Sequence, residues 1–360
     1  MAYKIFDFFS GCGGVSSGFK QAGFEVSFAL DSDTDALASF KMNFPNAHTI
    51  NCDIRSFDPA TLTEHIADRS HSIVFSGCAP CQPFSKQNKQ KKKDDSRVNL
   101  LLEFSRVISY WMPDFIFMEN VPGLQKDPEI SPFRVFVSTL KKLGYKLDVK
   151  VIKSCDYGVP QRRERLILLG SLHEPITMPE ATHGPSVGQA YRTVRDCISD
   201  LPPIEAGQRC SLDAEHISST LSKLNLERIR CTPEGKGRES WPEKLTLKCH
   251  KNHNGHTDVY GRLIWDNLAS GLTTRCNSLS NGRFGHPEQN RAISIREAAL
   301  LQTFPRDYRF SGSLNSKARQ IGNAVPPNLA LQVALKIRDI ADDTYQTALF
   351  NNTKMVANQE

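Results

Sequence analysis

The stretch with the clearest chemical potential is a cysteine loop, residues 78–85, with the sequence Cys-Ala-Pro-Cys-Gln-Pro-Phe-Ser. The apolar residues 73–75 before it predict the end of a short buried strand. The Gly, Pro and small polar residues that follow are typical of a loop. In open α/β sheets, ligands bind at the carboxyl ends of strands. Cys81, on a stiff Pro-Cys turn at such an end, is therefore a candidate nucleophile.

Two other interpretations of these cysteines remain open at this point. Most cysteines are small buried hydrophobic residues. Cys78 and Cys81 also form a C-x-x-C pair, which elsewhere is a redox pair or one half of a zinc site. The spacing alone does not decide between these roles.

A Gly-rich turn, residues 10–14, joins a predicted strand at 3–9 to a predicted helix that ends at Gly23. This order is typical of a nucleotide-type site, although a tight turn needs glycine for its geometry in any case. Asp31 ends the next predicted strand, roughly twenty residues after the turn, where an acidic residue can bind ribose hydroxyls. Asp31 could instead cap the following helix, but Asp33 is the better cap.

Another charged group ends a third apolar strand. The strand predicted within residues 113–121 closes on Glu119 after four apolar residues. Because a buried unpaired charge is costly, Glu119 needs either a salt bridge to an arginine or a role as a proton donor. Arg162, Arg163 and Arg165 precede the apolar strand 166–170, and we expect these arginines to serve a site rather than packing.

Strands and helices alternate along the first half of the chain, which predicts an α/β fold with a doubly wound parallel sheet. From about residue 175 to 260, Pro, Gly, Ser, Thr, His and basic residues dominate, and predict a smaller, loop-rich domain. Ser294 and Glu297 predict a capping box at the start of a helix. An apolar helix is expected at 328–340, with a frayed tail beyond residue 344.

The composition is that of an ordinary globular protein, with 39% hydrophobic and 23% charged residues among 360. The net charge of +6 suits a polyanionic partner without proving one. Ten scattered cysteines and a start without a signal-peptide core predict a reducing, cytoplasmic location. We expect no membrane association, because no apolar stretch approaches the ~20 residues needed to span a bilayer.

Taken in order, these segments resemble the blocks of the bacterial-type cytosine-C5 DNA methyltransferases found in restriction-modification systems. The resemblance runs from Asp7 to about Ile340, except for roughly residues 175–260. It is carried by the combination of Pro80-Cys81-Gln82, Glu119-Asn120-Val121, Gln161-x-Arg163-x-Arg165, Arg296-Glu297 and Gln320-Ile321-Gly322-Asn323.

The resemblance implies a Rossmann-like, S-adenosyl-L-methionine-dependent methyltransferase domain at 1–180, completed by 312–342. It also implies a target-recognition domain at 181–311 and a tail at 343–360. Asp31 would bind the ribose, and Ser32 stands where the family often has a bulky residue, so adenine stacking would be weaker or supplied elsewhere. The implied cofactor-binding residues are Phe9, Gly11, Cys12, Gly14, Asp31, Ser32, Asp53, Ile54, Pro80, Leu100, Asn323 and Val325.

By the same resemblance, Cys81 would add to C6 of a cytosine flipped out of duplex DNA. Glu119 would protonate or hydrogen-bond N3 and the exocyclic amine. Arg165 would hold O2, and Arg163 would organise the site. The basic loop 86–97 would close over the base, and the segment around 273–275 would read the major groove.

The resemblance further implies a monomer that acts in the bacterial nucleoid, has no metal and shares its site with a cognate restriction endonuclease. Cys249, His250, His253 and His256, with Cys231, could suggest zinc, but their spacing fits no finger pattern well, so a DNA-facing loop is favoured. The open alternatives are a tRNA cytosine-C5 methyltransferase of the same fold, a C-x-x-C thiol oxidoreductase and a catalytically silent DNA-binding relative. The long basic segment favours DNA.

Overall fold

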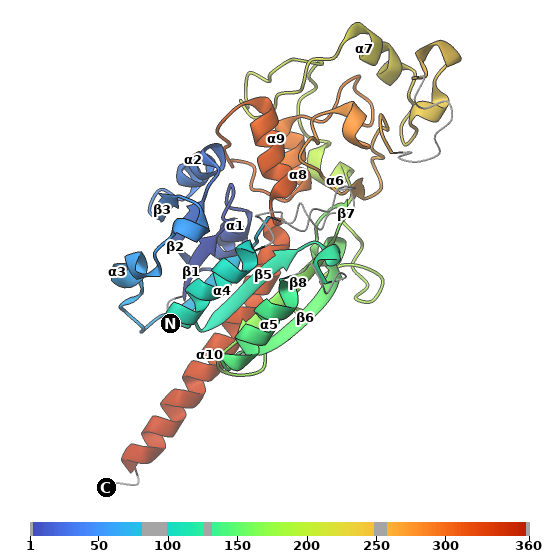
Figure 1. The fold of residues 1–360 in the computed structure, drawn as a ribbon. Coiled ribbons are helices and arrows are strands. Elements are labelled where there is room, and N and C mark those ends of the chain that lie inside the picture. Colours follow the sequence, from blue (N-terminus) through green and yellow to red (C-terminus); the bar gives the residue numbers. More distant parts are fainter. Residues whose placement is uncertain (1–2, 81–98, 126–131, 248–257, 358–360) are drawn as a thin grey trace.

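The computed structural model describes residues 3–80, 99–125, 132–247 and 258–357. A seven-stranded sheet with strand order β3-β2-β1-β4-β5-β8-β6 forms its centre (Figure 1). The strands of this sheet are β1 Tyr3–Phe8, β2 Glu25–Asp31, β3 His48–Asn51, β4 Ser72–Gly77, β5 Phe115–Asn120, β6 Lys146–Lys153 and β8 Glu164–Ser171. Its helices are α1 Gly14–Gln21, α2 Thr34–Asn43, α3 Thr63–Ile66, α4 Leu100–Trp111, α5 Phe133–Lys142 and α10 Pro327–Ala357.

The sheet is mixed rather than all parallel, so the predicted parallel sheet is wrong at one end. The strands from β3 to β5 are parallel, but β8 pairs antiparallel with both β5 and β6. The connection from β6 to β8, residues 154–163, holds one short 3-10 turn and the two-residue strand β7 Gln161–Arg162. A parallel pair needs a crossover of about a dozen residues or more, so this shorter connection returns the chain antiparallel.

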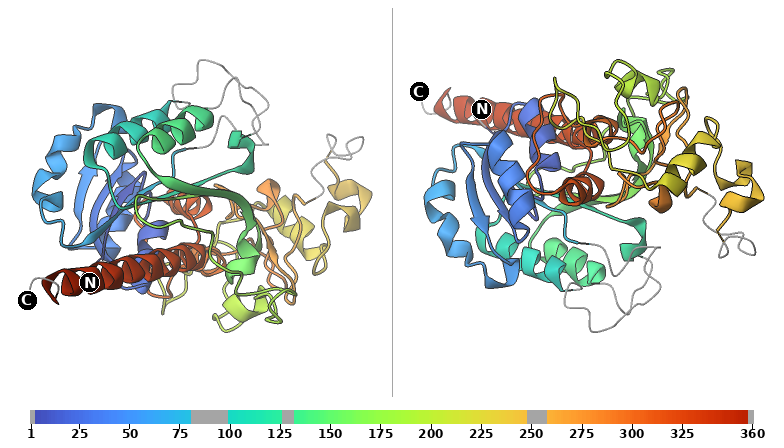
Figure 2. Two further views of the ribbon diagram at one scale, coloured as in Figure 1. Left: turned by 90° about the horizontal axis from the view of Figure 1, so that it is seen from below. Right: turned by 90° about the horizontal axis from the view of Figure 1, so that it is seen from above.

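Alternate side chains of β1 enter two different cores, as the period of a strand requires. Phe6 and Phe8 pack in one hydrophobic cluster with residues of α4 and α5. Ile5 packs in a second cluster with residues of α1 and α10. Figure 2 shows the same layering, with α4 and α5 on one face of the sheet and α10 on the other.

The last helix is longer than the sequence predicted. We expected it to end near residue 340 and to be followed by a frayed tail, but α10 continues to Ala357 and leaves the body of the molecule (Figure 1). Its first turns pack tightly on α1, where a Cβ at Gly18 would lie 2.4 Å from the Pro327 carbonyl oxygen. Glycine is therefore needed at this crossing because the two backbones approach so closely.

The described residues between 172 and 323 form a loop-rich half, distinct from the sheet half made of α10 and the described residues between 3 and 171. Its elements are short: α6 Arg195–Ile198, α7 Lys223–Arg230, β9 Ala269–Ser270, α8 Ile295–Leu301 and α9 Leu314–Asn323. The predicted capping box is confirmed, because Ser294 and Glu297 cap α8 reciprocally. One hydrophobic cluster joins Leu37 and Phe40 of α2 to residues of α8 and α9, so the two halves share a core.

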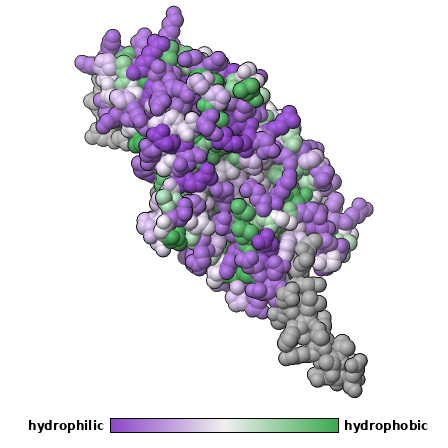
Figure 3. All heavy atoms as spheres, turned by 180° about the vertical axis from the view of Figure 1, so that it is seen from behind, coloured by the Kyte–Doolittle hydropathy of each residue, from purple (hydrophilic) through white to green (hydrophobic). Residues whose placement is uncertain are grey.

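The face of the molecule opposite to that in Figure 1 is mainly hydrophilic. On the face shown in Figure 3, hydrophobic side chains lie in small separate patches among polar ones. No helix within the described residues is long and apolar enough to cross a membrane.

Candidate active site

The loop after β1 has an unusual backbone held by the end of β2. Phe9, Gly11 and Gly13 have φ angles of 58°, 53° and 93°, a left-handed region that non-glycine residues rarely occupy. The Gly11 N–H donates to Asp31 Oδ2 at 2.7 Å, and the Asp33 N–H donates to Asp31 Oδ1 at 2.7 Å. Asp33 caps α2 by accepting from two backbone N–H groups. As predicted, Asp33 is the cap, which separates the roles of the two acids.

This loop fits a polar ligand. The Ser10 hydroxyl oxygen is buried and has no hydrogen-bond partner among the described residues. A Cβ built at Gly11 meets nothing within 4 Å, so there is open space against its backbone. Each Asp31 oxygen accepts a backbone N–H and keeps lone pairs that can accept ligand hydroxyls. Burial raises the pKa of Asp31, although the hydrogen bonds from the backbone oppose the shift.

The remaining predicted cofactor residues line the same edge in two groups. Phe9, Ile54 and Leu100 belong to one hydrophobic cluster, and α4 is fixed to this region because Arg106 donates to the Ile54 carbonyl oxygen at 2.9 Å. Gly14 lies against the segment before α10, where its added Cβ would be 2.3 Å from the Val325 carbonyl oxygen.

Four of the predicted cofactor-binding residues are exposed or make their side-chain contact with a near neighbour in the sequence. Ser32, Pro80 and Asn323 are exposed. The carboxylate of Asp53 is engaged by its near neighbour Arg55, whose Nε lies 2.9 Å from Asp53 Oδ1. This hydrogen bond lowers the pKa of Asp53 below its ordinary value. The contacts of Asp53 therefore do not connect it to Asp31. Cys12 is buried at the centre of the loop.

Glu119, at the end of β5, forms an ion pair with Arg165 of β8. Arg165 Nε lies 2.6 Å from Glu119 Oε1, and both side chains are mostly buried. The N–H is not aimed at the oxygen, so Oε1 still lacks a directed hydrogen bond among the described residues. The salt bridge that we considered for Glu119 is present. The pair still leaves acceptor capacity for a further partner.

The next residue, Asn120, ties the end of β5 to the loop that leaves β4. Its Nδ2 donates to the Ala79 carbonyl oxygen at 3.1 Å, and its Oδ1 accepts from the Val121 N–H at 2.9 Å. The Glu119 segment therefore lies beside the segment that leads to Cys81. Cys81 itself, the basic loop 86–97 and the residues Cys249, His250, His253 and His256 lie outside the described residues.

Arg163 ties two separate segments together by hydrogen bonds to three of their carbonyl oxygens. Its Nη1 donates to Leu272 at 3.1 Å and to Gly322 at 3.2 Å, and its Nη2 donates to Ala324 at 3.3 Å. Arg163 is only 5% exposed. The expectation that none of these arginines serves packing is therefore wrong for Arg163, because a buried guanidinium can satisfy several otherwise unpaired carbonyls.

Gln161, two residues before Arg163, braces the same junction. Its Nε2 donates to the Leu301 carbonyl oxygen at 2.6 Å, and its Oε1 accepts from the Leu272 N–H at 3.0 Å. Sequence reasoning did not assign roles to Ser10, Asn120 or Tyr308, all of which contact the site. Only Asn120 carried a signal, since it stands between Glu119 and Val121 in a block that we had singled out.

The part of the chain that the structure describes contains no group of three or more His, Cys, Asp or Glu side chains arranged to hold a metal ion. The site consists instead of a Gly-rich loop with an acid behind it, and a carboxylate–arginine pair two strands away in the sheet. Fold and site together are typical of the class of α/β enzymes that bind ligands at the carboxyl edge of the sheet.

The family follows from comparison with known proteins. Residues 3–339 match the family model described as C-5 cytosine-specific DNA methylase, and the chain belongs to this family. It is therefore a DNA (cytosine-5-)-methyltransferase, and the family implies that it uses a methyl donor.

Individual relatives agree with this assignment. The chain is 40% identical over 352 residues to the Type II methylase M.HgiDII of Herpetosiphon aurantiacus, covering 96% of this chain and 98% of the relative. It is 34% identical to the Type II methyltransferase M1.HphI of Haemophilus parahaemolyticus, covering 93% and 86%. A solved structure of a prophage-encoded E. coli protein shares the fold, with a TM-score of 0.74, 24% identity and coverage of 95% and 100%.

Proposed function

We propose that the methyl donor is S-adenosyl-L-methionine and that Cys81 is the nucleophile in methyl transfer to C5 of a cytosine flipped out of duplex DNA. One observation carries this proposal: the hydrogen bond from Asn120 to the Ala79 carbonyl oxygen. It sets Glu119 and its partner Arg165 beside the loop that leads to Cys81, so an acid, a cation and a thiol can meet one base.

The chain's own residues supply the steps that cytosine chemistry needs. Cytosine C5 is a poor nucleophile, so Cys81 Sγ first forms a bond to C6 and makes C5 electron-rich. Glu119 hydrogen-bonds or protonates N3, and Arg165 donates to O2, which neutralises charge that develops on the ring. After methyl transfer, a water molecule takes the C5 proton, the C5–H electron pair re-forms the C5=C6 double bond, and the Sγ–C6 bond breaks to release the Cys81 thiolate.

When bound, S-adenosyl-L-methionine supplies an electrophilic methyl group. Asp31 would accept from its ribose hydroxyls, and the backbone of residues 10–14 would lie against its polar end, where Ser10 offers a hydroxyl that has no partner among the described residues. Ile54 and Leu100 would flank the adenine from the hydrophobic cluster that they share. Asp53, Pro80, Asn323 and Val325 would complete the pocket.

We also propose a division of labour between the two halves. The sheet domain, residues 1–180 with 312–342, would carry out the reaction, and residues 181–311 would read the DNA sequence. Thr274 and Arg275 are exposed and follow Leu272, whose carbonyl oxygen accepts from Arg163. In this place they could reach base edges.

The names of the Type II relatives support a cognate restriction endonuclease. We further propose a cytoplasmic monomer that acts on the bacterial nucleoid.

Bisulfite sequencing of a plasmid tests the proposed function. The plasmid is recovered from a host that lacks cytosine methylation and expresses this protein or its Cys81→Ser variant. We expect protected cytosines in one short recurring context with the wild type and none with the variant. If the wild type binds S-adenosyl-L-methionine but protects no cytosine, the DNA reaction is contradicted, and transfer RNA becomes the substrate to test.

A further inference from the structure

We propose that Tyr308 is a positioning residue for the cofactor loop, residues 10–14. Its hydroxyl would hold the loop in the donor-binding conformation and anchor it to the loop-rich half of the chain. The inference rests on the proposed function, since it takes residues 10–14 as the binding site for S-adenosyl-L-methionine.

The Tyr308 hydroxyl touches the loop directly, although the two segments lie far apart in the sequence. It donates to the Cys12 carbonyl oxygen and lies 3.4 Å from the Gly13 carbonyl oxygen. The side chain is only 4% exposed. Burial raises the pKa of Tyr308 well above its ordinary value, so the hydroxyl keeps its proton and remains a donor at physiological pH.

The loop needs support from outside because its backbone conformation is unusual. Phe9 is a non-glycine residue at φ 58°, a conformation that costs free energy unless the surroundings fix it. Gly13 has φ 93°, which glycine adopts without steric strain but does not by itself select. A Cβ at Gly13 would lie 2.7 Å from the Tyr308 hydroxyl and 2.6 Å from Phe44. The ring of Tyr308 and the ring of Phe44 therefore form a wall in contact with the loop backbone.

The other end of Tyr308 is fixed by an ion pair between the buried Arg296 and the partly exposed Asp213. Its carbonyl oxygen accepts from Arg296 Nη1 at 2.9 Å. Arg296 Nε lies 2.6 Å from Asp213 Oδ2, and its Nη2 donates to Asp213 Oδ1 at 3.2 Å. Burial by itself raises the pKa of the Asp213 carboxyl, but the hydrogen bonds and charge of Arg296 outweigh burial and hold this pKa below its ordinary value. The carboxylate is therefore charged at neutral pH.

A second contact secures the same segment. Glu215 Oε1 accepts from the Phe310 N–H at 3.1 Å, and Lys317 Nζ lies 2.8 Å from Glu215 Oε2. A continuous chain of contacts thus leads from residues 213–215, in the half proposed to read DNA, through Arg296 and Tyr308 to the cofactor loop. Loss of the hydroxyl should loosen the loop without removing any group proposed to act in methyl transfer.

The test is titration calorimetry of S-adenosyl-L-methionine with Tyr308→Phe and a matched control, Tyr145→Phe. Tyr145 is equally buried and donates to the Pro113 carbonyl oxygen at 2.7 Å, on the opposite side of the sheet from α1 and α10. We expect Tyr308→Phe to raise the dissociation constant about tenfold, the effect of one buried hydrogen bond. Its kcat at saturating cofactor should stay within about twofold, and Tyr145→Phe should leave the dissociation constant unchanged.

A second variant, Asp213→Asn, tests the outer anchor with little risk to folding, because Asp213 is partly exposed. We expect a smaller rise in the same dissociation constant, about twofold to threefold. If the wild type binds S-adenosyl-L-methionine and both Tyr308→Phe and Asp213→Asn bind it with unchanged affinity, this inference is overturned and the proposed function still stands. An equal loss of cofactor affinity in Tyr145→Phe would also overturn the inference, since loss of any buried tyrosine hydroxyl would then have the same effect. A wild type that fails to bind S-adenosyl-L-methionine would instead overturn the proposed function, and this inference with it.

Discussion

The sheet half and the loop-rich half of this chain fill their interiors in different ways. The sheet half is packed with phenylalanines; the ring centroid of Phe75, for example, lies 5.5 Å from that of Phe6 and 5.1 Å from that of Phe8. Of the five buried arginines among the described residues, four lie in the loop-rich half: Arg228, Arg262, Arg291 and Arg296. The difference follows from how each half pairs its backbone.

Strand ladders satisfy the backbone groups of the sheet half, which frees its interior for apolar side chains. Loops leave carbonyl oxygens that need other donors. Arg262 shows the solution, since it donates to the carbonyl oxygens of Thr232, Ile229, His286 and Gln289. An arginine carries five N–H donors in a fixed planar arrangement. One side chain can therefore replace part of a missing strand ladder.

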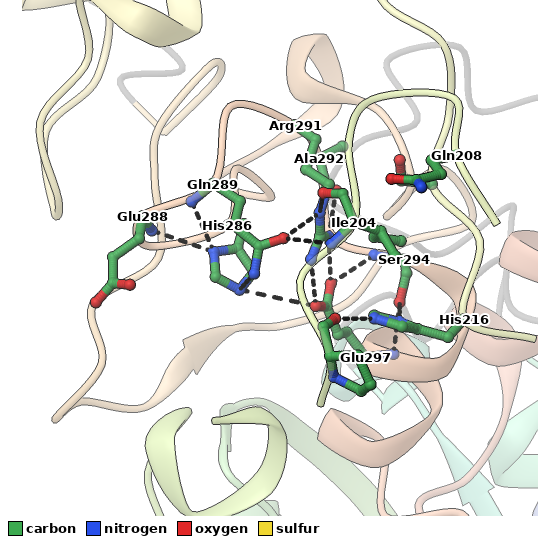
Figure 4. Close-up of polar contacts among 12 residues, drawn as sticks. Ile204, Gln208, His216, His286, Glu288, Gln289, Arg291, Ala292, Ser294 and Glu297 are labelled. Carbon is green, nitrogen blue, oxygen red and sulfur yellow. Dashed lines mark hydrogen bonds and ion pairs between the residues drawn. The ribbon is translucent and has the colours of Figure 1, made fainter. Parts of the chain in front are cut away.

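The largest predicted effect on stability concerns the buried pair of Arg291 and Glu297, shown in Figure 4. Arg291 Nη2 lies 2.7 Å from Glu297 Oε1, and both residues are at most 1% exposed. Arg291→Met leaves the Glu297 carboxylate buried without its partner, so urea denaturation should show a loss of about 3–5 kcal/mol. Adding Glu297→Gln to Arg291→Met should recover part of that loss. If the double variant is less stable than Arg291→Met, charge compensation is not what holds this half together.

A second prediction uses His286, which lies beside the same pair. Its Nδ1 accepts from the backbone N–H groups of Glu288 and Gln289, and burial lowers the pKa of His286 to about 4. The unfolded chain takes up a proton near pH 6.5, so this neutral histidine stabilises the fold above pH 6.5, and the contribution is lost as the pH falls toward 4. The stability advantage of the wild type over His286→Asn should shrink by about 3 kcal/mol across that range. A constant difference would contradict this account.

The sheet half should show the opposite dependence through Asp7. Its carboxylate accepts from the hydroxyls of Ser16 and Ser76, each at 2.6 Å. Burial raises the pKa of Asp7 to about 6. A raised pKa stabilises the fold below the unfolded value of about 3.8, and the contribution is lost as the pH rises through 6. The advantage of the wild type over Asp7→Asn should therefore fall by about 2–3 kcal/mol between pH 4 and pH 7. If the stability difference between wild type and variant changed with pH in the same direction for His286→Asn and Asp7→Asn, the contrast between the two halves would be contradicted.

The smallest predicted effect is that of Cys78→Ser. Cys78 is half-buried just before Ala79 and Pro80, and in our account its C-x-x-C spacing with Cys81 is incidental. Methylation should stay within about twofold of wild type, and the free energy of unfolding should change by less than about 1 kcal/mol. Loss of activity, together with a Cys78–Cys81 disulfide found by thiol titration, would favour the oxidoreductase interpretation.

The sequence predicted the sheet half far better than the loop-rich half. Apolar runs that end in polar residues predicted strand ends at Asp31, Phe75 and Glu119, within two residues of where β2, β4 and β5 end, because strand periodicity and burial are local properties. Sequence order also placed Asp33 as a cap and Ser294 in a capping box. The strand at 166–170 was predicted and is β8, but its antiparallel direction was missed, since that direction depends on the length of the connection before the strand rather than on the residues within it.

Contacts between residues far apart in the sequence could not be predicted. Nothing in the spacing of Tyr308 and Cys12 indicates that a hydroxyl meets a carbonyl oxygen there. The family resemblance implied that Arg163 organises the site, but it did not show that its guanidinium braces Leu272 and Gly322. Such roles depend on which loop carbonyls remain unpaired after folding, and only the three-dimensional structure shows this.

The most direct test of the central claim is covalent trapping with duplex DNA that carries 5-fluorocytosine in the recognition context found by bisulfite sequencing. Fluorine at C5 cannot leave as the proton does, so the bond from Cys81 Sγ to C6 should persist after methyl transfer. Peptide mass spectrometry should place the adduct on Cys81 in the wild type and find none in Cys81→Ser. An adduct on Cys78, or turnover by Cys81→Ser, would contradict the account.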